Sequence, residues 1–448
     1  MTKLPLSLFD DKECMRKAPK AALGKYLKTF GSVAAEQQSD KTHSVVIDGG
    51  WLLHQGHFTS GEPFNDIVSR YTAMVEKIAA GRQCSVVFDG YNTRPSPKDH
   101  EHKRRPKQHS ASIRLTGSTQ CTMTKARFLA NGHNKSQLIC LLRESFRTKG
   151  YRVATAEDDA DTLIVREAIQ TALSHTVEVR AEDTDVLCML VAHCTPALFA
   201  ISFQTKSGCF EVNTIYNKLP DGKRKVLLLA HAFSGCDTTS SIFGIGKLKV
   251  LSKLSSDAAP VDAIATFHDL CRASKDSVGK AGIVIMQYLY GREFASLAEL
   301  RFQRYNKQMA KGKLDPKRLP PTEQASIQHS LRVFLQWRDW TLLTSQSLDP
   351  RNYGWELSCG LLEPIGLVGE IAPSSLLNFT TCNCQTENVD APCKHNSCSC
   401  RRLGVHCLPA CGKCHGISCS NSKQSGPSDS NDEHEENSDP DDNDIDID

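Results

Sequence analysis

The chain has 448 residues, of which 40% are hydrophobic and 23% charged, a composition that suits two or three globular domains with a real core. Its net charge of +3 hides an asymmetry, because residues 423–448 hold eleven Asp and Glu against one Lys, which leaves 53 Lys and Arg against 40 Asp and Glu in residues 1–422. A basic body suits a polyanionic partner, and the lack of an 18-residue apolar run or a signal-peptide core excludes a membrane span and predicts an intracellular protein.

Residues 1–42 combine a basic, weakly helical stretch from Met15 to Phe30 with a linker that contains Ser, Gln and Asp. This segment shows no pattern that indicates chemistry. We therefore interpret it as an N-terminal extension.

Two apolar strands follow, and each ends in an aspartate. Residues 44–47 lead into Asp48, residues 85–88 lead into Asp89, and residues 64–80 between them carry apolar side chains at helical spacing. A strand–helix–strand unit places both aspartates at one edge of a parallel sheet. One such Asp is usually a helix cap or turn residue, but two in equivalent places favour a site.

A basic segment, residues 98–107, follows the second aspartate. It includes Lys103, Arg104 and Arg105, which either form a solvated surface or neutralise nucleic-acid phosphates. Residues 124–149 then predict a helix, and residues 151–154 predict a strand.

The densest acids lie between Glu157 and Asp185. Residues 157–161 and 182–185 form two acidic clusters, which are separated by a predicted helix from residue 160 and a predicted strand at 176–179. Carboxylates this close repel one another unless a cation joins them. The stretch therefore predicts half of a divalent-metal site with hard oxygen ligands.

Beyond Asp185 the pattern predicts an apolar helix at 186–191, strands at 198–203 and 210–216, and a helix at 226–233. The sequence Gly244-Ile245-Gly246-Lys247 then forms a turn before another helix. Glycines there would let backbone amides approach a phosphate, although a glycine C-cap explains the turn equally well.

Across residues 43–255 the order of these motifs resembles the flap endonuclease/XPG structure-specific nucleases, whose core is a PIN-like α/β domain with a parallel sheet flanked by helices. Seven acids match that family in order, namely Asp48, Asp89, Glu157, Asp159, Asp183, Asp185 and Asp237. The resemblance implies that they are catalytic and bind two Mg²⁺ or Mn²⁺ ions that hydrolyse phosphodiester bonds of DNA. Asp48, Asp89 and Asp159 would hold one ion, and Asp183, Asp185 and Asp237 the other.

The resemblance also implies that Gly244, Gly246 and Lys247 belong to a helix-two-turn-helix that binds a potassium ion and the DNA backbone. The segment with Lys103, Arg104 and Arg105 would be a helical gateway over the active site. The chain departs from the family in three respects: 47 residues precede Asp48, three prolines interrupt the gateway, and Asp159 stands where Glu is usual. Asp161 is an additional acid that could replace a neighbour as ligand.

Residues 256–375 predict a helical extension. Its clearest element runs from Thr322 to Trp340, where apolar and aromatic side chains recur at helical spacing. We interpret this stripe as core.

The C-terminal part contains a second metal-binding pattern. Nine cysteines lie within 38 residues that contain almost no large apolar side chains: Cys382, Cys384, Cys393, Cys398, Cys400, Cys407, Cys411, Cys414 and Cys419. So small a segment needs metal to fold, and nine thiolates with three of them bridging satisfy about three tetrahedral Zn²⁺. Two four-Cys sites with one spare thiol, or substitution by His395, His406 or His415, are the alternatives.

Residues 380–421 resemble the tesmin-like CXC zinc-cluster domain, although the last cysteines are more widely spaced than is usual. The resemblance implies DNA binding through Arg401 and Arg402. Residues 422–448 have the composition of a disordered acidic tail.

The sequence thus predicts a structure-selective, Mg²⁺- or Mn²⁺-dependent endonuclease that acts on DNA, assisted by a zinc module, in the nucleus. The alternative is a catalytically inactive nuclease-like protein that binds nucleic acid, or a mobile-element-derived chromatin protein. Protein partners are not indicated by any motif.

Overall fold

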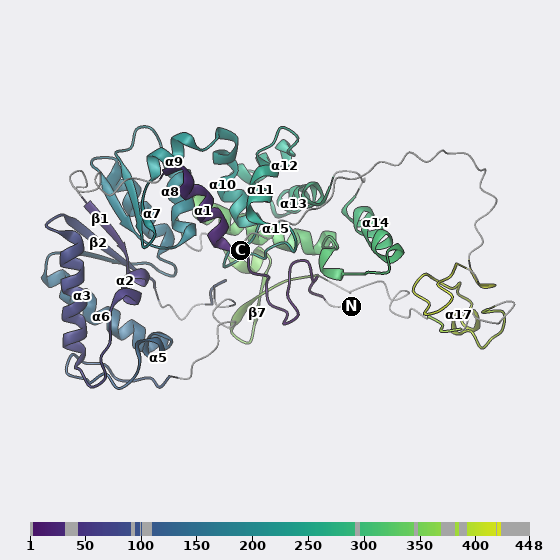
Figure 1. Cartoon of the computed structure of the whole chain (residues 1–448), viewed down its shortest axis with the longest axis horizontal. Helices are drawn as coiled ribbons and strands as arrows, with labels where there is room; N and C mark the ends of the chain where they lie inside the picture. Colours follow the sequence, from purple (N-terminus) through teal and green to yellow (C-terminus); the bar gives the residue numbers. More distant parts are fainter. Residues whose placement is uncertain are drawn as a thin grey trace. The chain divides into compact units, whose positions relative to one another are not determined.

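A computed structural model describes residues 3–31, 44–90, 95–98, 100, 110–291, 296–344, 348–368, 381–384, 392–417 and 419–422. The chain divides into two compact units, residues 1–369 and 370–448 (Figure 1). The first unit contains the sheet and nearly all helices. The second contains the cysteine-rich segment.

A six-stranded sheet lies at the centre of the first unit, with strand order β3-β2-β1-β4-β5-β6. All neighbouring pairs are parallel except β5 and β6, which are antiparallel. The strands are β1 (Ser44–Asp48), β2 (Gln83–Phe88), β3 (Arg152–Thr155), β4 (Val177–Arg180), β5 (Ile201–Thr205) and β6 (Gly208–Glu211). The mostly parallel sheet flanked by helices confirms the predicted α/β class.

Helices cover both faces of the sheet and continue as a helical body. Those between the strands are α2 (Gly49–Gln55), α3 (Phe64–Ala79), α5 (Lys125–Leu129), α6 (Gly132–Thr148), α7 (Asp161–Ala172) and α8 (Thr184–His193). Those outside are α1 (Lys20–Gly31), α9 (Val212–Lys218), α10 (Asp221–Phe233), α11 (Lys247–Leu254), α12 (Val261–His268), α13 (Lys275–Tyr290), α14 (Leu297–Ala310) and α15 (Glu323–Leu342). None of these described helices has the length and hydrophobicity needed to cross a membrane.

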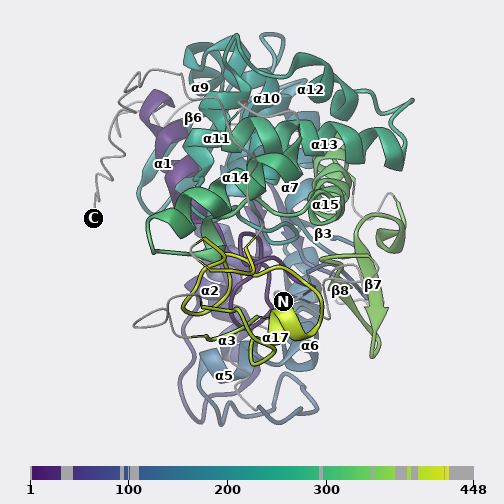
Figure 2. The ribbon, with the colours of Figure 1, turned by 90° about the vertical axis from the view of Figure 1, so that its right-hand side faces the viewer.

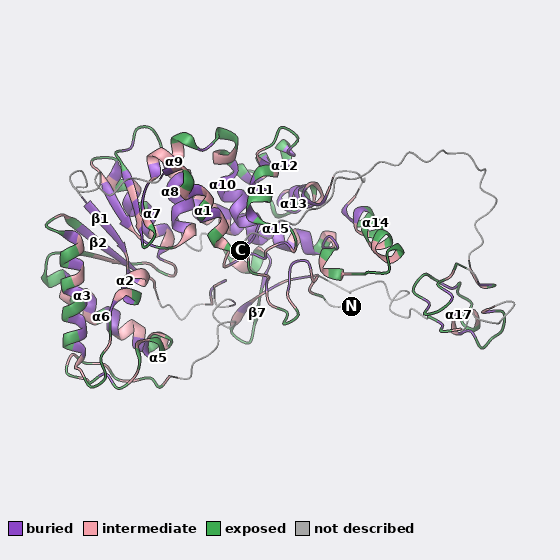
Figure 3. Ribbon diagram, viewed as in Figure 1, coloured by how far each residue is buried: buried purple, intermediate pink, exposed green. Residues whose placement is uncertain are grey.

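Strand alternation divides the interior into two cores. Val45 and Ile47 of β1 pack with α3 and α6, whereas Val46 packs with α7, α8 and the helical body on the opposite face. Figure 3 shows the resulting buried layer in the strands, α8, α10 and α15. The burial of both faces explains why the strand sequences are continuously apolar rather than alternating.

The strand order places the acids. The chain runs outward from β1 through β2 to β3, and then returns to the other side of β1 to form β4. Asp48 of β1 pairs with Val87, and Phe88 pairs with Thr155, so the carboxyl ends of these strands coincide within about a residue. Such a reversal of strand order opens a crevice at the carboxyl edge of a parallel sheet.

The helical body ends in a small hairpin of β7 (Trp355–Ser358) and β8 (Leu361–Pro364), which Figure 2 shows beside α15. Arg332 of α15 is 1% exposed and donates hydrogen bonds to the carbonyls of Gly354 and Ile365 at 2.9 and 2.7 Å. These bonds fasten the hairpin to α15, whose extent confirms the predicted helix at 322–340.

Three local expectations were wrong. The predicted strand at 210–216 ends at Glu211 and continues as α9, because Asn213 turns back and accepts a hydrogen bond from Ile201 N. The helix expected at 124–149 is divided at Asn131, whose side chain caps α6. Glu157 lies before α7 rather than on one helix face with Asp161.

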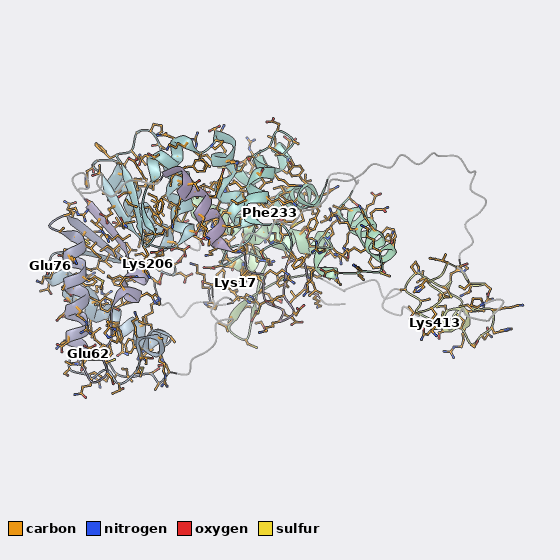
Figure 4. All side chains as sticks on the ribbon, in the orientation of Figure 1. Lys17, Glu62, Glu76, Lys206, Phe233 and Lys413 are labelled. Carbon is orange, nitrogen blue, oxygen red and sulfur yellow. The ribbon has the colours of Figure 1, made fainter. Side chains whose placement is uncertain are left out.

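The second unit is held by its cysteines. Its one named helix is the short α17 (Ser399–Arg402), and its described interior consists of buried Cys side chains. Lys413, labelled in Figure 4, belongs to this unit.

Gly49 offers a test of how tightly α2 packs on the sheet. A methyl group there would overlap the ring of Phe88, which is fully buried and has no room to move. Gly49→Ala should lower the free energy of unfolding by about 1–3 kcal/mol, the usual effect of overpacking. Urea denaturation measures the change. Gly132→Ala is the matched control, because its methyl group meets no atom within 4 Å; an equal loss in both variants would contradict the packing argument.

Candidate metal centre

Two acidic residues lie at the carboxyl ends of the neighbouring strands β1 and β2. Asp48 caps α2, and its Oδ1 accepts a hydrogen bond from Gly50 N at 2.7 Å. Asp89 follows β2, and its Oδ1 accepts from Ala160 N at 3.2 Å, while Lys135 Nζ lies 3.6 Å from Asp89 Oδ2. The bond to Ala160 joins the end of β2 to the start of α7.

The first acidic cluster is positioned by Gly90, whose N donates to Asp158 O at 2.7 Å. Lys98 Nζ lies 2.5 Å from Asp159 Oδ2 and 3.7 Å from Asp161 Oδ2. Glu157 is exposed on the loop. Asp161 therefore lies closer to the other acids than Glu157 does. The sequence had left open whether Asp161 replaces a neighbour as a ligand.

The second acidic cluster begins α8. Asp183 caps this helix through a hydrogen bond from Asp185 N at 2.9 Å, and Asp185 is 4% exposed. One carboxylate oxygen from each of Asp161, Asp183 and Asp185 lies within 4.8 Å of the others. These residues lie at the starts of two helices, so a cation between them would join α7 to α8.

A buried chain of polar groups supports Asp185. Its Oδ1 is 2.8 Å from His231 Nε2, and His231 Nδ1 is 2.8 Å from Lys247 Nζ. Lys247 also donates to His231 O and Gly235 O. The ring of His231 stacks on Trp340 with centroids 5.0 Å apart, which fixes its orientation.

Asp237 reaches the same place through Lys20. Lys20 Nζ lies 3.0 Å from Asp237 Oδ2, 2.8 Å from Asp185 Oδ2 and 4.0 Å from Asp183 Oδ1. The structure thus connects Asp237, which lies after α10, with the acids after β4. Lys20 is the first residue of α1.

Burial and mutual repulsion dominate the electrostatics. Burial raises the pKa of Asp48 to about 7 and, with repulsion from Asp185, the pKa of Asp183 to about 6. Burial and the charge of Asp159 likewise raise the pKa of Asp161. Burial opposes ionisation of Asp185 as well, but Lys20 and His231 overcome it and lower the pKa of this carboxyl. A group of carboxyls that binds protons this readily is one that positive charge would stabilise.

The donor set fits a hard divalent cation. Asp161, Asp183 and Asp185 each place one carboxylate oxygen within 4.8 Å of the other two, and the imidazole of His231 is bonded to Asp185. Mg²⁺ and Mn²⁺ prefer such ligands.

Many solved structures are similar to the chain, and three of them serve as examples. They are the flap endonuclease of bacteriophage T5 crystallised with metal ions (13% identity, 67% of this chain and 99% of that chain, TM-score 0.34), the catalytic core of Rad2 with a DNA substrate (15%, 72% and 97%, 0.35) and the Holliday junction-resolving enzyme GEN1 with product DNA and Mg²⁺ (15%, 75% and 63%, 0.36). No protein-family model and no curated protein matches the sequence. At these TM-scores the superpositions define no shared site residues.

The predicted helix-two-turn-helix, with Gly244, Gly246 and Lys247, lies beside a cavity of about 450 Å³. The cavity is lined by residues 242–247 and by Arg16 and Lys17 of the N-terminal segment; Figure 4 labels Lys17. Gly244 has φ +74°, a conformation that glycine adopts without strain. The Lys247 side chain is 3% exposed and its Nζ is bonded internally, and the contact of this residue with DNA stays a prediction. The potassium ion stays a prediction.

The cysteine cluster contains all nine predicted thiols. Four sets of four cysteines each lie close enough to share an ion, and together they contain every member. The Sγ atom of Cys382 lies 3.7 Å from the Sγ atoms of Cys393, Cys407 and Cys414. A tetrahedron with Zn–S bonds of about 2.3 Å has edges of about 3.8 Å, so these separations fit zinc thiolates and exclude disulfides.

Of the two arginines expected to contact DNA, Arg401 has a structural role. Its Nε donates to Cys393 O and its Nη2 to Ser420 O, both at 2.7 Å. Arg402 is exposed. Lys103, Arg104 and Arg105 lie outside the described residues.

Sequence reasoning missed four residues that contact the acids, namely Lys20, Lys98, Lys135 and His231. Lys98 is the first residue of the basic segment 98–107, so its position soon after Asp89 could have predicted a contact with the acids. Lys20 is 165 residues from Asp185, and nothing in residues 1–42 pointed to it. His231 lay on a helix whose buried face looks apolar in sequence.

The raised pKa of Asp48 predicts a pH-dependent stability. Because its folded-state pKa of about 7 exceeds the ordinary 3.8, the folded protein binds this proton more tightly than the unfolded chain, and stability falls as the pH rises through that interval. In EDTA, Asp48→Asn should therefore be more stable than wild type by about 1–3 kcal/mol at pH 8, with no gain near pH 4. Thermal unfolding against pH measures this. Asp66→Asn, at an exposed position, should show no such trend.

Proposed function

We propose that the chain is a divalent-metal-dependent nuclease that hydrolyses phosphodiester bonds of structured DNA. The single observation that carries the proposal is the convergence of acids from five separate chain segments at the carboxyl edge of the sheet. Within this set, burial raises the pKa values of Asp48, Asp161 and Asp183, and carboxyls perturbed in this way are typical of functional sites.

Two sets of carboxylates would hold the ions. Asp48, Asp89 and Asp159 or Asp161 form one, and Asp183, Asp185 and Asp237 form the other, with Asp161 close enough to Asp183 and Asp185 to lie between the sets. Bound divalent ions supply an activated water and charge stabilisation for the leaving oxygen. Glu157, exposed on its loop, would take part only from the outer side.

The chain's own cations suit a phosphate at the same edge. Lys98 and Lys135 place ammonium groups against Asp159 and Asp89, where a phosphate entering the crevice would meet them. Arg16 and Lys17 line the cavity beside Gly244, a further basic surface for the backbone of a duplex. The net positive charge of residues 1–422 supports a nucleic-acid partner and localisation in the nucleus.

One observation favours a second function, nucleic-acid binding without cleavage. Lysine ammonium groups already pair with most of the acids, so these carboxylates have cationic partners without a metal ion. A nuclease panel decides between the two: flap, bubble, hairpin and single-stranded DNA and the matching RNAs, each with Mg²⁺, Mn²⁺ or EDTA. Binding of several substrates with no cleavage under any metal would support the inactive protein.

Asp159→Ala and Asp183→Ala should reduce cleavage more than about 100-fold while DNA affinity stays near that of the wild type, because each removes an inner carboxylate and no basic group. Single-turnover cleavage and fluorescence anisotropy measure the two quantities. Asp183→Asn separates ligation from helix capping, since Asn also caps helices. Asp257→Asn, at an exposed position, is the matched control; activity in the two Ala variants equal to the control would reject the proposal.

We also propose that the nine cysteines hold about three Zn²⁺ and that this module binds DNA through its exposed basic side chains, Arg402 among them. The support is the tetrahedral spacing of the Sγ atoms and the near absence of any other core.

Purified protein should contain about three Zn²⁺ per chain. Cys407→Ser should lower that number by at least one, because Cys407 belongs to three of the four sets, whereas Cys271→Ser, at an exposed position in the first unit, should leave it unchanged. Mass spectrometry of metal content measures both. A zinc-free wild type that keeps its folded second unit would contradict the assignment.

A further inference from the structure

The N-terminal extension delivers a lysine into the acidic crevice. Lys20 Nζ bridges Asp185 and Asp237 at 2.8 and 3.0 Å, with Asp183 at 4.0 Å. These three acids are the whole of one proposed ion-binding set. A single ammonium group therefore stands where that set would hold a divalent cation.

Both carboxylate oxygens of Asp185 already have a partner. Asp185 Oδ2 accepts from Lys20, and Asp185 Oδ1 faces His231 Nε2 at 2.8 Å. His231 is fully buried and held from behind by Lys247. Of the two partners of Asp185, the lysine side chain is the one that is 23% exposed and can leave.

The backbone around Lys20 is fixed on both sides. Before it, Ser241 N donates to Arg16 O at 2.7 Å and Ser241 Oγ to Lys17 O at 3.0 Å. After it, Leu23 is buried in the core of the first unit, and Gly24 lies so close to α8 that an added Cβ would be 2.8 Å from Thr184 Oγ1. Thr184 stands between Asp183 and Asp185, so glycine at position 24 permits the approach that brings the ammonium group to the acids.

We propose that Lys20 is an internal competitor of divalent cations at Asp183, Asp185 and Asp237. In the resting protein its ammonium group pairs with these carboxylates and offsets part of their charge, and an ion binds this set by displacing the side chain. The tether makes the ammonium group an effective competitor, because its local concentration does not fall on dilution.

The inference rests on the proposed function only in that the same carboxylates bind the ions, and metal binding tests it without any cleavage assay. The zinc-loaded, full-length protein is titrated with Mn²⁺, and free Mn²⁺ is followed by electron paramagnetic resonance. Lys20→Met keeps most of the side-chain length and removes the charge. Lys25→Met, exposed on the same helix, is the matched control.

We expect Lys20→Met to bind Mn²⁺ more tightly than the wild type, on the order of tenfold, or to bind an additional equivalent. Without metal it should melt at a lower temperature, because three acids lose their counter-ion, and Mn²⁺ should restore its melting temperature more than it raises that of the wild type. Adding Asp185→Asn to Lys20→Met should abolish the gain. Lys20→Arg and Lys25→Met should bind Mn²⁺ as the wild type does.

Equal Mn²⁺ binding by the wild type and Lys20→Met would overturn the inference, and weaker binding by Lys20→Met would show that the lysine organises the carboxylates instead of competing for them. Should Lys20→Met fail to fold, Lys20→Gln, which can still donate hydrogen bonds to the acids, answers the same question. A protein that cleaves no substrate but shows the Mn²⁺ difference would lose the nuclease proposal and keep this one. Cleavage with no Mn²⁺ difference would do the reverse.

Discussion

The repulsion among carboxylates at one sheet edge is the constraint on which the first unit depends. Asp159, Asp161, Asp183 and Asp185 are brought together by strand ends and helix starts that the fold cannot separate, and burial makes each charge harder to tolerate. Lysines from distant segments form ion pairs with these acids. Lys20 pairs with the acids after β4, Lys98 with those at the start of α7, and Lys135 with Asp89. Removing any acid's partner without another cation would leave charge in a low-dielectric crevice.

This compensation joins parts of the chain that have little else in common. The N-terminal helix α1, the loop after β2 and the helix α6 each contribute one ammonium group to a crevice formed by other elements. The same crevice meets the helical body through His231, Lys247 and Trp340, so the acids are supported from the sheet and from α15 behind it. A ligand bound at the acidic edge would therefore contact residues that are connected both to the sheet and to the helical body.

The second unit is stabilised by its cysteine side chains instead of an apolar core. Its described large apolar side chains, Leu403, Val405, Leu408 and Ile417, are exposed, so its folding energy has to come from bonds between thiolates and metal rather than from burial. The separations of 3.6–3.8 Å among its Sγ atoms fit that role. Arg401, half-buried and bonded to two carbonyls of the same unit, adds two hydrogen bonds to this framework.

The sequence by itself determined the sheet, most helices, the acids that follow the strands and the cysteine cluster. These features are local: apolar runs, helical periodicity and the spacing of like residues are all visible along the chain. Only the tertiary structure decided which acids meet, that Asp161 and not Glu157 joins the inner group, and that Lys247 is buried. It also decided that Lys20, in a segment without any pattern, reaches Asp185 across 165 residues. Such contacts arise from the packing of α1 against α8, α9 and α11, which depends on surface shape and on a glycine at position 24, and no periodicity along the chain encodes them.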